Sequence, residues 1–465
     1  ASAYGAEAPN IFYPAASFAA RLDKLGFLPE VINLAKFRAA YGENGRLPGL
    51  TDGQSLLWTN GASPYGAGAA VSIAGNTAIQ PERTREIELG LEMEFDNAYG
   101  FEATYYISNS TQSLVNLPRP PSTGLGNKPS NIAALDGWGF ESMIYARPIQ
   151  SADYSLDLRL IFNYADNLVK SLGYEAGGPA QLTDNRQFII PGQRRSQFMG
   201  LRPLTPRFQA NGYYDWVNQG RNGLEIDTTG MVRNAAGGIV GYAIGSGVPL
   251  YTGSFSVEFR FLHDFTIYAL AEYALEGYVF NNTAQFATGV AYYNNPQFNR
   301  LATQLGIYGA GVSPTNGAAA QERGPGAQGF GTAGLLTVGR VPGVAVLTPG
   351  TAEYQAAAIA FQKLEPRIAS MQANNYTEKA NWLRIRELSL RYNATNLINS
   401  IVGTPAIKNL SLSLTANNFA LFTTYSGPEV ELNTNPGAAN GVTTSVDFLT
   451  LMQSRVINFI VSFGF

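Results

Sequence analysis

Four carboxylates on one short segment are the side chains with the clearest chemical potential in this sequence. Between residues 86 and 95, glutamates alternate with large apolar residues, and the glutamates are Glu86, Glu88, Glu92 and Glu94. A pair of carboxylates could supply the acid and the base of a glycoside hydrolase. Residues two apart on a β-strand share one face, however, so these four form a regular row. We therefore predict that they face water or a polar lumen, as part of a wall and not as a catalytic pair.

Other catalytic and metal chemistry finds little support in the sequence. The chain has no cysteine and one histidine, His263, which excludes thiolate metal sites, histidine-based triads and multi-histidine metal sites for this chain. The stretch of residues 215–227 resembles a calcium-binding loop only loosely, because Arg221 would oppose a cation. A glycine- and asparagine-containing turn is the better interpretation, with calcium as the alternative. We expect no enzymatic activity and no cofactor.

Aromatic residues gather in the segments between the predicted strands. The candidates for ligand contact are Tyr213, Tyr214, Trp216, Tyr278, Tyr292 and Tyr293. Such residues could stack on sugar rings or grip peptides, and aromatic residues also mark the membrane interface. Both interpretations stay open.

The composition is closer to that of a membrane β-barrel than to that of a soluble protein. Charged residues make up 14% of the chain, against about 25% in a typical soluble protein. Tyrosine and phenylalanine number 25 and 26, yet no run of about 20 apolar residues predicts a transmembrane helix. The formal net charge of -3, without a long basic run, argues against a nucleic-acid partner.

Eleven segments show the period of two that predicts β-strands. They are residues 11–22, 31–41, 86–95, 101–107, 137–147, 154–164, 255–261, 265–273, 382–392, 410–416 and 455–465. Most are about ten residues long, which is the length that crosses a bilayer at a tilt of roughly 45°. Each segment is therefore long enough for a membrane-spanning strand.

The connections between these strands alternate in length. Those after the first, third, fifth and seventh strands are short, whereas those after the second, fourth, sixth and eighth are long. A soluble β-sandwich has no reason to place every long loop at one end, but outer-membrane barrels combine short periplasmic turns with long extracellular loops. We predict an all-β fold, a transmembrane antiparallel β-barrel in contact with the lipid of a bacterial outer membrane. Within the longest connection, the composition of residues 351–372 predicts a helix.

The last strand is predicted to close the barrel. Its large apolar residues recur at every second position, as Ile457, Phe459, Val461, Phe463 and Phe465, and we expect these five to face lipid. Eleven strands with an extracellular start cannot close a barrel that normally has an even strand number and both ends in the periplasm. We therefore interpret residues 1–465 as a C-terminal portion of a barrel, whose last edge pairs with a strand outside this chain. The signal peptide that such a protein needs is expected to precede it too.

Six segments resemble one family, the SusC/RagA-type TonB-dependent outer-membrane transporters. They are Tyr13–Phe18, Leu34–Gly42, Gln80–Leu91, Asn381–Tyr392, Leu414–Thr423 and Tyr425–Val430, and they follow the family's order across nearly the whole chain. The resemblance implies a 22-stranded barrel, of which this chain forms about half, around an N-terminal plug domain that lies outside residues 1–465. It also implies contact with TonB through that missing region, and a SusD-like surface lipoprotein as partner.

The function implied by the resemblance is nutrient import, with oligosaccharides or peptides as substrates. Two alternatives stay open, a passive porin-like channel and a structural protein of an outer-membrane assembly. The sequence carries no readable code for the substrate, because the loops that would select it have no recognisable motif.

Overall fold

The computed structural model describes residues 12–464, apart from several internal segments. The segments that it leaves out are residues 50–51, 54–57, 64–65, 72–74, 118–127, 173–180, 185–186, 201–207, 209–211, 213–230, 234–238, 286–295, 307–308, 313–335, 339–340, 365–375, 404–406 and 432–444.

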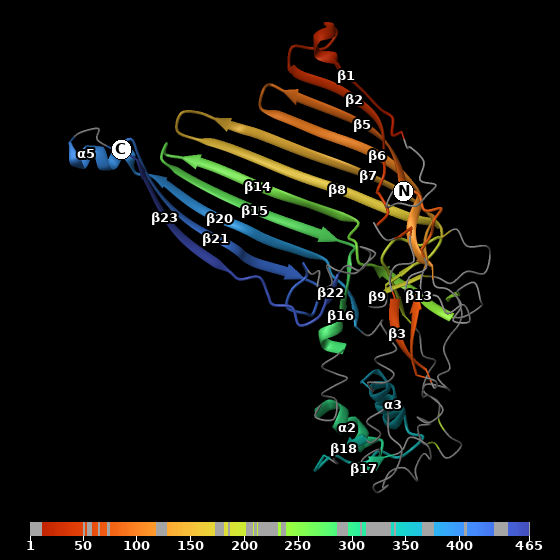
Figure 1. The fold of residues 1–465 in the computed structure, drawn as a ribbon. Coiled ribbons are helices and arrows are strands. Elements are labelled where there is room, and N and C mark those ends of the chain that lie inside the picture. The colour runs from red at the N-terminus through yellow and green to blue at the C-terminus, as the bar shows by residue number, and fades with distance from the viewer. Residues whose placement is uncertain are drawn as a thin grey trace.

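One antiparallel sheet of eleven strands dominates the described structure (Figure 1). The strands are β1 (Ala15–Arg21), β2 (Ile32–Asn44), β5 (Arg83–Phe95), β6 (Tyr99–Leu117), β7 (Lys128–Gln150), β8 (Ser155–Ser171), β14 (Tyr251–Phe261), β15 (Phe265–Leu275), β20 (Trp382–Asn393), β21 (Asn409–Thr423) and β23 (Val456–Gly464). They pair in this order, so the sheet is an up-and-down meander with β1 and β23 at its edges. The eleven predicted strands and the all-β fold class are confirmed, and the sheet formed by the described residues is open.

Local chemistry explains where strands begin and turn. β1 starts directly after Pro14, whose ring removes the backbone N–H that a sheet ladder needs. Asp96 and Asn97 both adopt a positive φ, of 50° and 54°, and they join β5 to β6. A two-residue turn with this conformation has a twist that suits antiparallel strands. Asparagine and aspartate tolerate the conformation, which is why the turn was predictable from the sequence.

The β6–β7 hairpin is longer than predicted. The connection over residues 111–136 was predicted as a long loop, but β6 continues to Leu117 and β7 begins at Lys128. The two strands stay paired past Ser110, with bulges around Ser113. The prediction was wrong because tertiary packing supports the extension: Val115 and Ala133 are buried in a cluster with Val169, Leu172 and Ile189, and a local hydrophobic period does not show such packing.

The long connections fold into smaller elements beyond one end of the sheet (Figure 1). These are β3 (Trp58–Ser63), β4 (Gly66–Val71), β9 (Gln181–Asp184), β10 (Gln187–Ile189), β11 (Gln197–Gly200), β12 (Val232–Arg233), β13 (Ile239–Ser246), β16 (Tyr278–Asn281), α2 (Pro296–Gln304), β17 (Gly309–Val312), β18 (Leu336–Val338), α3 (Ala352–Leu364), β19 (Thr377–Lys379) and β22 (Val446–Asp447). The short turns at the other end hold η1 (Leu22–Leu25) and α5 (Thr395–Val402). No helix in the described part of the chain is long and apolar enough to span a membrane.

Helix α3 confirms the helix predicted in the longest connection. The Phe361 ring of α3 lies 4.9 Å from the Phe298 ring of α2, and both side chains are fully buried. The Tyr354 hydroxyl donates a hydrogen bond to the Leu305 carbonyl at 3.4 Å. The helix therefore packs against its own loop, and the Tyr354 ring also lies 6.3 Å from the Phe208 ring of the β8–β14 connection.

Buried contacts also join three of the long connections. Phe198 of β11 and Phe280 of β16 lie with ring centroids 6.3 Å apart, and Val446 of β22 completes their cluster. The hydroxyl of Ser445 donates to the Gly247 carbonyl at 2.6 Å. Since these residues come from the connections after β8, β15 and β21, the three loops form one packed layer at the long-loop end of the sheet.

Candidate functional site

The eleven-stranded sheet has two chemically different faces, and the glutamate row lies on the polar one. The register sets Glu92 of β5 opposite Lys36 of β2 and Glu102 of β6. Arg38 Nε lies 2.8 Å from Glu92 Oε1, and Lys36 Nζ lies 3.3 Å from the same oxygen. Alternation along β5 sets Glu86, Glu88 and Glu94 on the same face as Glu92. That this face lines a lumen remains a prediction.

Glycines on the polar face make room for the side chains of neighbouring strands. Gly90 interrupts the glutamate row, and a Cβ built there would lie 3.2 Å from three guanidinium atoms of Arg38. The same arrangement recurs one hairpin further, where the Tyr106 ring lies over Gly139 of the adjacent strand. The long polar side chains therefore lie flat along the sheet, because the opposing residue has no side chain.

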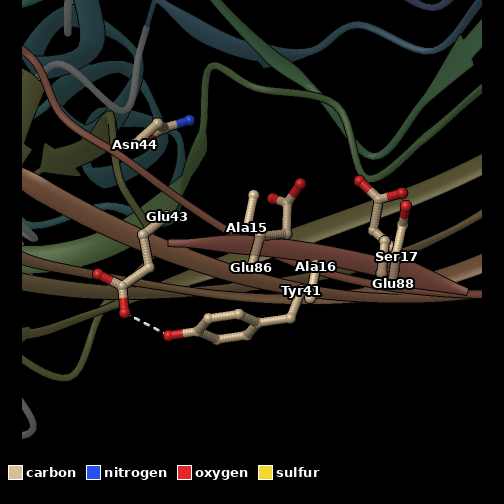
Figure 2. A pocket seen from close by; sticks show the side chains of 10 residues that line it. Ala15, Ala16, Ser17, Tyr41, Glu43, Asn44, Glu86 and Glu88 are labelled. Carbon is tan, nitrogen blue, oxygen red and sulfur yellow. Dashed lines mark hydrogen bonds between the residues drawn. The ribbon is translucent and has the colours of Figure 1, made fainter. Parts of the chain in front are cut away.

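Glu86 and Glu88 border an open groove of about 350 Å³ at the β1 edge of the sheet. Ser17 of β1 and Tyr41 and Glu43 of β2 also line it. Figure 2 shows the carboxylates of Glu86 and Glu88 on one side of the strands, and the Tyr41 ring with the Glu43 carboxylate on the other. The groove therefore sits where the two faces meet at a strand edge.

The opposite face, called the apolar face below, is built from large exposed hydrophobic side chains. On β23, Phe459 lies opposite Leu414 and Phe463 opposite Leu410 of β21. Other exposed members of the face are Phe18, Phe37, Ile87, Leu89, Tyr105, Ile107, Phe140, Ile144, Leu160, Phe255, Ile267, Leu390, Phe422, Ile457 and Val461. An apolar surface that crosses every strand is far larger than a soluble protein exposes to water. Lipid contact of the terminal strand remains a prediction, and Phe465 lies outside the described residues.

Aromatic and charged residues bound the apolar face at its two ends. At the short-turn end, the ring centroids of Phe261 and Phe265 lie 5.3 Å apart. The ring centroids of Phe265 and Tyr392 lie 4.6 Å apart. At the long-loop end, the Asp166 carboxylate, two residues beyond Tyr164, pairs with Arg194 at 2.6 Å. The 11 residues of β14 lie between these limits, and they span about 34 Å of strand, or roughly 24 Å across a membrane at a 45° tilt. This height matches the apolar band of outer-membrane barrels, which is about 25 Å.

A buried ion cluster anchors the last long connection to the polar face. Arg384 of β20 forms an ion pair with Glu429, and both side chains are almost fully buried. Arg386 follows two residues later on β20. Its Nε lies 2.5 Å from Glu272 Oε2 of β15, and its guanidinium also pairs with Glu431. The cluster therefore joins two neighbouring strands to the connection that leads into β23.

Backbone donors complete the Glu429 site. Glu429 Oε1 accepts the N–H of Val430 at 2.9 Å, and Oε2 accepts the N–H of Gln453 at 3.2 Å. Burial alone would raise the pKa of Glu429, but these backbone donors and the Arg384 charge outweigh it and lower the pKa. Glu429 is therefore held as a carboxylate.

No pattern in the sequence predicts this cluster. Arg384 and Glu429 lie in two of the segments on which the family resemblance rests, but they are separated by 45 residues and nothing in the sequence pairs them. A second buried contact nearby was missed for the same reason. The Tyr425 hydroxyl donates to Asp447 Oδ2 at 2.8 Å, and burial together with this carboxylate raises the pKa of Tyr425 far above its ordinary value.

The other predicted site residues are not brought together by the described structure. Tyr213, Tyr214, Trp216, Tyr292 and Tyr293 lie outside the described residues, as does the whole of the loosely calcium-like stretch 215–227. Tyr278 belongs to β16, and its ring packs over Gly245. His263 sits in the short β14–β15 turn, where its Nδ1 lies 2.7 Å from Asp153 Oδ1. The roles predicted for the loop aromatics therefore stay predictions.

The chain is similar to known proteins over most of its length. Residues 7–419 match the family described as TonB dependent receptor-like, beta-barrel. TonB-dependent receptor P3 of Formosa agariphila is 24% identical over 458 residues, which cover 91% of this chain and 38% of that protein. TonB-dependent receptor P39 of the same organism is 27% identical over 175 residues, or 36% of this chain and 17% of that protein.

Among solved structures, the RagAB peptide transporter has a similar fold. The TM-score is 0.62 at 16% sequence identity, and the match covers 99% of this chain and 44% of that chain. Identity this low shows the fold alone. The chain spans less than half the length of these relatives. Because the family match covers most of the chain, this chain belongs to the TonB dependent receptor-like, beta-barrel family of outer-membrane proteins.

Proposed function

We propose that this chain forms barrel wall in a TonB-dependent importer that moves oligosaccharides or peptides across the outer membrane. The observation that carries the proposal is the two-faced sheet, with hydrophobic side chains on one side and the charges around Glu92 and Arg38 on the other. A wall between lipid and a polar passage needs this distribution of residues. The structurally similar RagAB is a peptide transporter by its description, which supports import of an oligomeric nutrient.

The proposed mechanism is confinement of the substrate, with no bond made or broken. The packed layer of long loops, joined through Phe198, Phe280 and Val446, forms the extracellular mouth that receives the substrate. A SusD-like surface lipoprotein covers this mouth, and the polar face lines the route past a plug domain. No cofactor, metal or catalytic residue is assigned to the chain, and we propose that it is not an enzyme.

The rest of the barrel is proposed to come from parts of the protein outside residues 1–465. The relatives are more than twice as long as this chain, so they have room for further strands, a plug domain and a TonB-binding segment. In this proposal the free edge of β23 pairs with the first strand of the barrel, because an unpaired edge cannot persist in lipid.

Uptake of labelled substrates by whole cells tests the proposal. Cells that carry the complete protein are given fluorescent oligosaccharides or peptides, with and without an uncoupler that collapses the proton gradient. A TonB-dependent importer predicts accumulation that the uncoupler abolishes and that is absent from cells without the gene. A porin-like channel predicts uptake that the uncoupler leaves unchanged. A purely structural protein predicts no difference in uptake between the two strains.

A further inference from the structure

The apolar face ends, on β2 and β5, in a cluster of four polar residues. Arg83 Nε donates to Glu43 Oε2 at 2.5 Å, and Arg85 Nε lies 3.2 Å from Glu43 Oε1. The Tyr41 hydroxyl also donates a hydrogen bond to the same carboxylate. Figure 2 shows Tyr41 and Glu43 on the side of the strands opposite to Glu86 and Glu88. The cluster therefore lies on the face that we assign to lipid.

This cluster carries an excess of positive charge. In the part of the chain that the structure describes, Glu43 is the one carboxylate within ion-pair distance of Arg83 or Arg85. Its side chain is 4% exposed, whereas the arginine side chains are 33% and 50% exposed. The Glu43 carboxylate is thus enclosed by Arg83, Arg85 and Tyr41, whereas both arginine side chains remain partly exposed. The arginines are held side by side by their shared carboxylate.

The neighbouring ion pairs at the same height are balanced. Asp136 of β7 pairs with Lys170 of β8 at 3.1 Å, and Asp166 pairs with Arg194 at 2.6 Å. Each of these contacts matches one cation to one anion. These two neighbouring pairs are therefore neutral, whereas the cluster around Glu43 keeps one positive charge.

The level of the cluster in the membrane indicates which chemical group of the lipid contacts it. Ile87, two residues from Arg85 on the same face of β5, is 52% exposed, and Leu89 beyond it is 47% exposed. Opposite Arg85 and Arg83 on β6 stand Asn109 and Thr111 instead of apolar residues. The boundary between acyl chains and headgroups thus falls between Ile87 and Arg85. In the outer leaflet of an outer membrane, the charged groups at that level are the phosphates of lipopolysaccharide.

We propose that Arg83 and Arg85 form a binding site for a phosphate group of lipopolysaccharide, with an acyl chain of the same molecule along Ile87 and Leu89. Arginine suits this role because its planar guanidinium donates paired hydrogen bonds to phosphate oxygens and stays charged. Glu43 and Tyr41 orient the two arginines. The site rests on the outer-membrane location of the family and is independent of which substrate the protein imports.

Lipid binding by the complete protein, purified from outer membranes in mild detergent, tests the site. Native mass spectrometry during titration with lipid A, and with lipid A from which the phosphates have been removed, measures the apparent affinity for each. The paired substitution Arg83→Gln with Arg85→Gln is expected to weaken phosphorylated lipid A binding about tenfold, since each lost charge-assisted hydrogen bond matters. The paired change of both arginines to lysine is expected to weaken binding less than the glutamine pair does, because it keeps the charge but loses the paired hydrogen bonds.

The matched control is Arg147→Gln. Arg147 is also a partly exposed arginine with one carboxylate partner, Asp157 at 2.9 Å, but it lies at the short-turn end. Heat-dependent migration in gel electrophoresis verifies that each variant is folded. The proposal is overturned if the folded glutamine double variant binds as tightly as the Arg147 control, or if the unmodified protein binds both forms of lipid A equally.

Discussion

Arg384 and Glu429 form an ion pair in which both side chains are buried, with 4% and 3% of their surface exposed. The pair connects β20 to the connection between β21 and β23, and Arg384 Nε also lies 2.9 Å from Glu431 Oε2. Charges taken out of water this completely persist only when they are matched by opposite charges and hydrogen bonds. The pair therefore fixes the path of the chain as it approaches the last strand.

Replacing Glu429 by alanine should destabilise the protein strongly. Removing one partner of a buried ion pair costs about 3–5 kcal/mol, because the other charge stays buried. We expect the lower end of this range, since Glu431 remains beside Arg384. Unfolding of the purified complete protein by urea, in lipid vesicles, measures the change. Glu276→Ala is the control, because it removes an exposed partner of Lys379 and should leave stability nearly unchanged. Equal losses in both variants would contradict the buried-pair interpretation.

The contribution of Glu429 should depend on pH in one direction. Its pKa in the folded protein is lowered from the ordinary 4.5, so the folded state binds fewer protons than the unfolded state at mildly acidic pH. The stabilisation is complete above the ordinary pKa and is lost as pH falls through the lowered one. Comparing unfolding free energies of the unmodified protein and Glu429→Gln should show a constant difference from pH 7 to about 5 and a shrinking one below about 4.5. A difference that grows on acidification would refute the assignment.

Gly139 should not tolerate a side chain. A Cβ at this position would lie 2.4 Å from the Tyr106 hydroxyl oxygen, so Gly139→Ala must shift the Tyr106 side chain. Overpacking of this kind costs about 1–3 kcal/mol. Gly42, on the same polar face, has no atom within 4 Å of a built Cβ, and Gly42→Ala serves as the control. Thermal unfolding followed by circular dichroism measures both. Equal midpoints for the two variants would show that the ring has no fixed place on the sheet.

Opposite faces of β23 should respond differently to the same charge. Phe459 is 68% exposed on the apolar face, opposite Leu414, whereas Asn458 lies opposite Thr415 on the polar face. Arginine facing lipid near the middle of a membrane costs about 2–4 kcal/mol, and less near its borders. Phe459→Arg should therefore reduce the amount of folded protein in the outer membrane, measured by immunoblot of membrane fractions. Asn458→Arg should leave that amount close to normal. The reverse order would mean that the faces are assigned the wrong way round.

Much of the sheet was predictable because its signal is local. Alternation over ten residues sets both the strand and its two faces, and the contrast between Glu92 and Leu91 needs no distant contact to be seen. Turn residues such as Asp96 and Asn97 are equally local, since their own conformational preferences form the hairpin. The strand count and the two faces of each strand could therefore be predicted from neighbouring residues alone.

The sequence by itself determined the strands, their two faces and the alternation of short and long connections, because each of these follows from neighbouring residues. Only the tertiary structure decided how the long loops pack, where the β6–β7 pairing ends, and which charges meet. Arg384 and Glu429 lie in separate segments, and the energy that joins them comes from burial that a linear pattern does not record. The cluster of Glu43, Arg83 and Arg85 was decided in the same way, by a strand register that places residues 40 positions apart side by side.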